Sequence, residues 1–130
     1  MDNEFILSPG TYFLGDPSIV IQKKGDAIKF INQLWDHVYE DRVRFKKIVV
    51  DQITFYIMKS ISGDGVYQGI STDSGVISLI DCKDLKNENL FRIPKAEKGF
   101  KWLVLHENTI VYEKEGILEI QNHIKIDTNS

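Results

Sequence analysis

The fold is decided by residues 26–59, which read DAIKFINQLWDHVYEDRVRFKKIVVDQITFYIMK. In the first part of this stretch, apolar side chains recur every three to four residues, which is the period of an amphipathic helix. From Phe45 onward, runs of β-branched and aromatic residues alternate with short breaks, a pattern that is typical of strands. One helix followed by many strands predicts an α+β domain.

The helix is expected over residues 26–40, because Asp26 can cap free backbone amides at its start. The side chains expected on its buried face are Ala27, Ile28, Ile31, Leu34, Trp35 and Val38. The polar face carries Lys29, Asn32, Gln33, Asp36, His37 and Glu40. With Trp35 pointing inward, the helix is expected to cover one face of a sheet.

Strands are expected both before and after the helix in the sequence. Residues 11–14 and 18–22 are predicted to form a hairpin around Gly15-Asp16-Pro17. After the helix, the short breaks indicate antiparallel neighbours. These later strands are predicted at 45–50, 53–61, 66–71, 76–80, 100–106, 109–115, 117–121 and 124–127.

The sheet is therefore expected to be mainly antiparallel and to form a sandwich or a partly open barrel. Residues 82–94 lose periodicity and are predicted to be a loop with one helical turn at 83–87. Trp102 and Tyr112 fall on strands predicted to be adjacent, which favours a cross-strand core pair over a stacking site for a planar ligand.

Length and composition bound the function. The 130 residues fit a single domain over 1–130, and 42% apolar residues can fill its core. A net charge of −3 argues against general nucleic-acid binding, which needs an excess of Lys and Arg. Cys82 is the only cysteine, no signal segment opens the chain, and no apolar run has the length of a membrane span. We therefore expect a cytoplasmic protein without a membrane partner.

Three short turns built on glycine beside aspartate or serine punctuate the chain: Gly15-Asp16-Pro17, Gly63-Asp64-Gly65 and Asp73-Ser74-Gly75. Glycine reaches positive φ without a clash, and Asp and Ser side chains bond to nearby backbone amides. If the turns converge on one rim, they form a ligand-binding site. Its candidate residues are Asp16, Asp64, Tyr67, Asp73 and Ser74.

The three aspartates admit two other interpretations. Asp beside Gly is what a tight turn requires, so Asp16, Asp64 and Asp73 can serve the turn backbone alone. Alternatively, clustered carboxylates can divide acid and base roles or hold a hard cation. A small carboxylate- or metal-dependent hydrolase is therefore the alternative function.

Other reactive side chains lack the motifs of known sites. His37, His106 and His123 show no HExxH or CxxC pairing, and Ser74 lacks the GxSxG pattern of a nucleophile elbow. Cys82 has no base identified beside it. We accordingly predict no catalytic residue, no metal site and no cofactor.

Arg42, Arg44 and Lys46 alternate along the chain and would share one face of an extended segment. Such a face can receive an acidic partner or a phosphate. Nearby carboxylates at Glu40 and Asp41 reduce the positive potential of this face, so a solvated strand face is the simpler interpretation.

The turns belong to a wider set of short motifs. The set comprises Pro9-Gly10-Thr11-Tyr12, Gly15-Asp16-Pro17, Trp35 in a helix, Gly63-Asp64-Gly65-Val66-Tyr67, Asp73-Ser74-Gly75 and Ile124-Lys125-Ile126-Asp127-Thr128. In these motifs the chain resembles a loose group of small uncharacterised bacterial and bacteriophage proteins that share a GDP turn, a GDG-x-Y hairpin and a DSG turn. The resemblance implies a bacterial or phage context and no catalytic residues.

The function expected from these observations is that of a non-catalytic binding protein. We expect a bacteria- or phage-encoded accessory, inhibitor or immunity-type factor that acts on a protein partner or a small ligand. A homodimer is also expected, because the apolar run Ile117-Leu118-Glu119-Ile120 can leave a sheet edge that needs covering.

Overall fold

The computed structural model describes residues 4–95 and 98–129. Its strands are β1 (Glu4–Leu7), β2 (Gly10–Gly15), β3 (Phe45–Val50), β4 (Ile53–Lys59), β5 (Gly65–Tyr67), β6 (Ile70–Thr72), β7 (Val76–Asp81), β8 (Lys101–Leu105), β9 (Thr109–Lys114), β10 (Ile117–Ile120) and β11 (Ile124–Asp127). The helices are α1 (Asp26–Tyr39) and the short 3-10 turns η1 (Pro17–Ile19) and η2 (Cys82–Lys86). The expected α+β class is confirmed.

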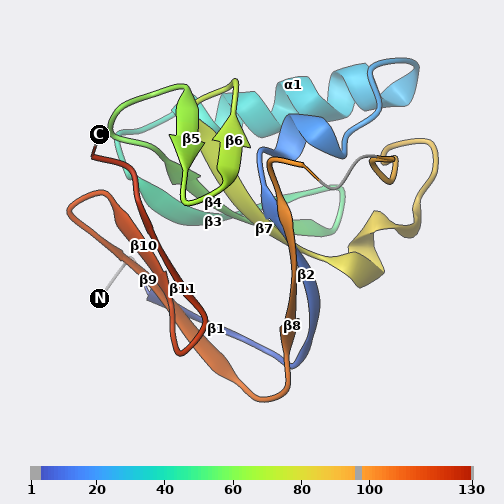
Figure 1. The fold of residues 1–130 in the computed structure, drawn as a ribbon. Coiled ribbons are helices and arrows are strands. Elements are labelled where there is room, and N and C mark those ends of the chain that lie inside the picture. Colours follow the sequence, from blue (N-terminus) through green and yellow to red (C-terminus); the bar gives the residue numbers. More distant parts are fainter. Residues whose placement is uncertain (1–3, 96–97, 130) are drawn as a thin grey trace.

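The strands form two sheets and a small hairpin, with antiparallel pairing throughout the described residues. The five-stranded sheet has the order β3-β4-β7-β2-β8, the four-stranded sheet has the order β1-β9-β10-β11, and β5 pairs with β6. Helix α1 lies on one face of the five-stranded sheet, as Figure 1 shows, and the four-stranded sheet lies toward the other. The described strands do not close into a barrel.

Two apolar clusters hold these layers together. The first packs α1 against the five-stranded sheet and includes Phe13, Phe30 and Phe55. The second lies between the two sheets and includes Leu14 and Leu118. Strand β7 contributes to both clusters, so five of its six residues are buried and four of the six are apolar, without the alternation of a strand that has one exposed face.

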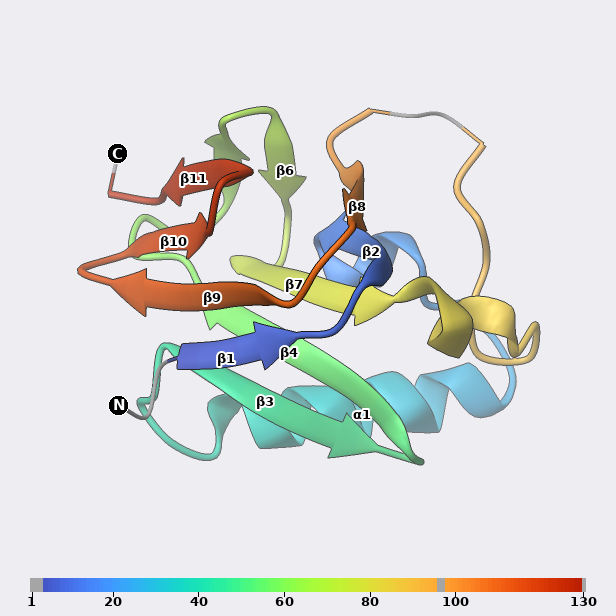
Figure 2. The same ribbon diagram turned by 90° about the horizontal axis from the view of Figure 1, so that it is seen from below.

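The two sheets are joined at one corner. Strand β1 pairs with β9, and the next strand, β2, pairs with β8. Residues 4–15 and 101–114 thus make one long antiparallel pair that bends from the four-stranded sheet into the five-stranded one (Figure 2). At the bend, the Tyr12 hydroxyl donates a hydrogen bond to the Ser8 carbonyl oxygen at 2.8 Å.

Helix α1 is where predicted, but its inward face is rotated. The buried side chains are Ala27, Phe30, Leu34 and Val38. Ile28, predicted to be buried, is 51% exposed, and Trp35 is only partly buried at the edge of the first cluster. Phe30, which the expected buried face does not include, is 1% exposed.

The predicted return strand at 18–22 is wrong. Asp16 caps η1 by accepting a hydrogen bond from the Ser18 amide, and Pro17 occupies the first turn, where its missing N–H is harmless. Of this segment, only Ile21 makes a β-bridge, to Phe91. The neighbours of β2 are therefore the distant strands β7 and β8.

Two further strand predictions need correction. The predicted strand 66–71 is the hairpin β5–β6, because Gln68 and Gly69 adopt φ of 49° and 83° and turn the chain back. Trp102 and Tyr112 belong to different sheets, and Trp102 instead packs its ring 5.6 Å from the ring of Phe13. The helical turn predicted at 83–87 corresponds to η2.

Tyr12, at this corner, is expected to make the free energy of unfolding depend on pH. Burial, followed by the charge of Asp81 on the adjacent strand, raises the pKa of Tyr12 to about 12. An unfolded chain ionises tyrosine near pH 10, so the contribution of Tyr12 to stability is complete below about pH 10 and is lost as the pH rises toward 12. We expect the free energy of unfolding in urea to fall less between about pH 9 and pH 11 in Tyr12→Phe than in wild type.

The control for this experiment is Tyr39→Phe, because Tyr39 is 60% exposed. This variant should keep the wild-type decline. Equal declines in Tyr12→Phe and wild type would contradict the assignment of the pH dependence to Tyr12.

Candidate functional site

The turn after β2 and the turn before β7 meet at Asp16. The Asp16 side chain is 1% exposed, and its Oδ1 accepts a hydrogen bond from the Ser18 amide at 2.9 Å. Its Oδ2 accepts from the amides of Asp73 and Ser74 at 2.9 and 3.1 Å and from the Ser74 hydroxyl at 2.9 Å. The Thr72 hydroxyl lies 3.0 Å from the same oxygen. One buried carboxylate thus connects two turns that are far apart in the chain.

The third turn, Gly63-Asp64-Gly65, is connected to the turn before β7 through Ser60, and Tyr67 also bonds to it. The Tyr67 hydroxyl donates to the Gly63 carbonyl oxygen at 2.7 Å, and the Ser60 hydroxyl lies 2.6 Å from that oxygen and 3.1 Å from the Gly75 carbonyl oxygen. Gly63 and Gly75 both have positive φ, of 76° and 74°. A Cβ added to Gly75 would lie 3.6 Å from the Gly63 Cα, so the two loops are in contact.

All three turns therefore lie together, in a network that we call the turn cluster: Asp16, Ser60, Tyr67, Thr72 and Ser74. Their carboxylates do not gather in the same way, because Asp16 is buried whereas Asp64 and Asp73 are exposed. Within residues 4–95 and 98–129, no group of three or more His, Cys, Asp or Glu side chains is placed to hold a metal ion.

Arg42, Arg44 and Lys46 do not form the strand face expected of them, since only Lys46 lies within β3. The Lys46 amine contacts the His37 carbonyl oxygen at the end of α1 and lies 3.2 Å from Asp41 Oδ2. Arg44 Nη1 lies 3.8 Å from Glu113 Oε2. Lys46 thus stabilises the carbonyl end of the helix, and carboxylates neighbour two of the three cations.

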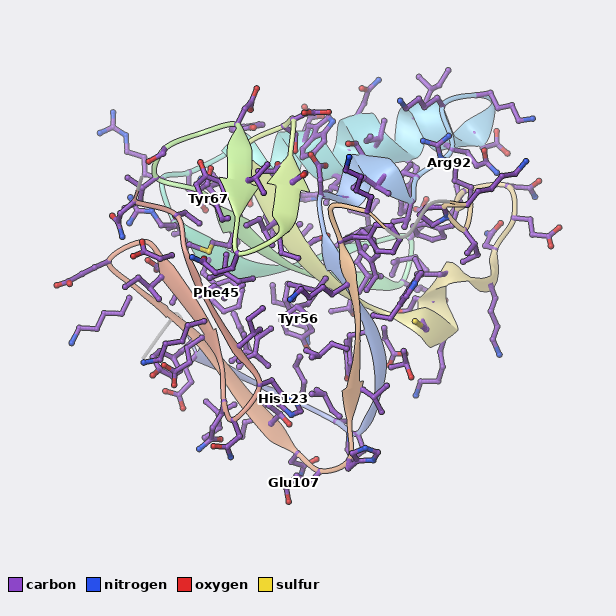
Figure 3. All side chains as sticks on the ribbon, in the orientation of Figure 1. Phe45, Tyr56, Tyr67, Arg92, Glu107 and His123 are labelled. Carbon is purple, nitrogen blue, oxygen red and sulfur yellow. The ribbon has the colours of Figure 1, made fainter. Side chains whose placement is uncertain are left out.

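A hollow of about 510 Å³ adjoins the turn cluster. We call it the basic hollow, and it is lined by Ser18, Ile19, Lys23, Asp73, Arg92, Ile93, Pro94 and Lys95. Among the residues that the structure describes, three cations thus line the hollow beside one carboxylate, that of Asp73. Figure 3 labels Arg92 at the end of the molecule where α1 begins.

The turn cluster builds one wall of the basic hollow. The two backbone amides of Ser18 and Asp73, both lining residues, donate to the same Asp16 carboxylate. Arg92 is bonded to the segment that follows Ser18: its amide and Nε donate to the Val20 and Ile19 carbonyl oxygens at 2.7 and 3.1 Å. These bonds fix the Arg92 stem and leave the four N–H donors of its two Nη atoms at the outer edge of the guanidinium.

The cations of the hollow, Lys23, Arg92 and Lys95, form no ion pair with the carboxylates that the structure describes. Sequence reasoning missed all three, because Lys23 precedes the helix and the other two lie in or just after a segment interpreted as a loop. No local spacing connects them, and only the pairing of residues 20–22 with 90–92 brings them together.

Comparisons of the chain with protein-family models, with curated proteins and with solved structures find no match. In the part of the chain that the structure describes, no helix combines the length and the apolar character needed to cross a bilayer. The turn cluster and the basic hollow are therefore the features from which a function can be inferred.

Proposed function

We propose that the protein is a non-catalytic binding protein that recognises an anionic group at the basic hollow. The observation that carries this proposal is the set of three cations, drawn from two segments of the chain, in a hollow whose described lining residues include one carboxylate. This local excess of positive charge occurs in a chain whose net charge is −3. Arginine and lysine in a concave site favour phosphate and carboxylate groups.

The role of Asp16 favours binding over hydrolysis. A hydrolase of the alternative type would need its carboxylates to face the substrate. Asp16 instead lies behind the wall of the hollow and accepts hydrogen bonds from backbone amides of that wall. The Asp16 carboxylate therefore fixes the backbone conformation of the wall.

The biological setting of the proposal follows the resemblance described above. We propose an accessory, inhibitor or immunity-type factor in the cytoplasm of a bacterium or of a phage-infected cell, with the anionic group supplied by a protein partner or a small ligand. The homodimer also stays a prediction, checked by light scattering. The strand that motivated it, β10, lies between β9 and β11 and is not an edge.

Titration with inorganic phosphate tests the binding site. Arg92→Gln should weaken phosphate binding at least about tenfold, because a charge-assisted hydrogen bond is worth about 1.5–3 kcal/mol. Asp73→Asn should strengthen it, because this change removes the carboxylate found among the described lining residues, and with it a negative charge that repels the anion. Calorimetry or amide chemical shifts at Ser18 and Asp73 measure both effects.

Arg42→Gln is the matched control, because Arg42 is an exposed arginine outside the lining of the hollow. This variant should bind phosphate as wild type does. The proposal would be overturned if wild type showed no saturable phosphate binding, or if the Arg92 and Arg42 variants bound phosphate equally well.

A further inference from the structure

A second hollow, of about 610 Å³, shares Arg92 and Ile93 with the basic hollow. We call it the apolar hollow, after the side chains of Cys82, Leu85, Phe91 and Ile93 that line it. Besides Arg92, the charged residues among its described lining are Lys86 and Glu88, which are opposite in sign. The basic hollow therefore has an excess of cations, whereas the charges of Lys86 and Glu88 cancel in the second hollow, where four of the eight described lining residues are apolar.

The wall between the two hollows is held by backbone pairing. The Gln22 amide donates to the Leu90 carbonyl oxygen at 2.8 Å, and the Arg92 amide donates to the Val20 carbonyl oxygen at 2.7 Å. The Gln22 side chain adds a bond to the Phe91 carbonyl oxygen at 3.1 Å. The two hollows thus have a fixed spatial relation, which a single ligand can exploit.

Ile93 stands at this wall with 64% of its surface exposed. An apolar tail that crosses Ile93 into the apolar hollow would remove this surface and the tail itself from water. An anionic head on the same molecule would lie among Lys23, Arg92 and Lys95. Each hollow has the volume of a small-molecule site.

We infer that the ligand is a small monomeric amphiphile, with a phosphate or carboxylate head in the basic hollow and an alkyl tail in the apolar hollow. This inference rests on the proposed function, because it assigns the anionic head to the same cations. It adds a specific requirement for an apolar tail. Octyl phosphate below its micelle concentration is the probe, and inorganic phosphate is the head-group reference.

Cys82 provides a site-specific reporter of the tail. It is the only cysteine of the chain, and it lines the apolar hollow. Octyl phosphate should slow alkylation of Cys82 by iodoacetamide several-fold at saturation, whereas inorganic phosphate should leave the rate unchanged. Octyl phosphate should also bind at least about tenfold more tightly than inorganic phosphate, since alkyl burial adds to the head-group contacts.

Ile93→Ser separates the tail from the head. This variant should lose most of the advantage of octyl phosphate over inorganic phosphate. Because Ile93 also lines the basic hollow, the readout is the ratio of the two affinities, in which a change in head-group binding cancels. Ile6→Ser is the matched control, because Ile6 is 65% exposed on β1, away from both hollows. It should behave as wild type with both probes.

Failure of this inference is distinguishable from failure of the proposed function. If inorganic phosphate binds through Arg92 but octyl phosphate binds no more tightly, the amphiphile is rejected and the anion site stands. The amphiphile is likewise rejected if Cys82 alkylation is not slowed, or if Ile93→Ser and Ile6→Ser behave alike. Binding to anionic lipid vesicles without binding of monomeric octyl phosphate rejects it in favour of a membrane surface. If neither phosphate probe binds, the proposed function fails as well.

Discussion

Replacing Asp16 with alanine is expected to lower the free energy of unfolding by about 3–5 kcal/mol. The carboxylate is 1% exposed and accepts hydrogen bonds from the amides of Ser18, Asp73 and Ser74. Without it, these donors lose their partner in a place that water reaches poorly, and a buried donor without an acceptor is costly. Urea denaturation at neutral pH measures the loss.

Asp73→Ala is the control for this prediction. Asp73 belongs to the same group of turns, but its side chain is exposed, and it is its backbone amide that bonds to Asp16. The control should change the free energy of unfolding by no more than about 0.5 kcal/mol. A loss below about 1 kcal/mol in Asp16→Ala would mean that the turns hold together without the carboxylate.

Phe30→Ala is expected to cost about 3–5 kcal/mol, because it leaves a cavity in the first apolar cluster. The Phe30 ring is 1% exposed, and its centroid lies 5.5 Å from that of Phe91 and 5.9 Å from that of Phe55. One ring on α1 therefore joins the helix to the sheet and to the segment that carries Arg92. Thermal and urea unfolding of the variant measure the effect.

Ile28→Ala, two residues earlier on the same helix, is the matched control. Because Ile28 is 51% exposed, its truncation should cost no more than about 0.5 kcal/mol. If the two substitutions had equal effects, the orientation of α1 described above would be wrong. Trp35→Ala should fall between them, because Trp35 packs only against the edge of the cluster.

The elements that periodicity specifies were predictable from the sequence. The helix, and strands such as β3 and β9, occur within a residue or two of the predicted bounds. The orientation of the helix was less well specified, because α1 has apolar side chains on two adjacent stripes. One stripe contains Phe30 and Leu34, and the other contains Ile28 and Trp35. Only contact with a sheet decides between them.

The error at residues 18–22 has a different cause. Ile19-Val20-Ile21 has the β-branched composition of a strand, and Gly15-Asp16-Pro17 has that of a hairpin turn. In the fold, Asp16 bonds to amides more than fifty residues away and begins a 3-10 turn instead. These long-range partners override the local preference, and no window of neighbouring residues contains them.

In the candidate site, too, some features follow from local sequence and others depend on long-range contacts. The sequence showed the composition of the three glycine turns and left their convergence open as a condition, and the structure brings them together. The inward role of Asp16 and the grouping of Lys23, Arg92 and Lys95 depend on contacts between distant segments. Single cations scattered through a chain carry no periodic signal, so the basic hollow was invisible in the sequence.

The corner at which the two sheets join has a consequence for synthesis in the cell. Tyr12, Phe13 and Leu14 of β2 pair with β7 and β8, and Gly10 lies opposite Leu105. Such non-local pairing delays folding, because a long chain must be closed before its contacts form. Strand β2 therefore leaves the ribosome long before β7 and β8 have been synthesised. The apolar side chains of β2 must stay shielded until the last third of the chain emerges. We expect the nascent chain to depend on chaperones until β8 has been translated.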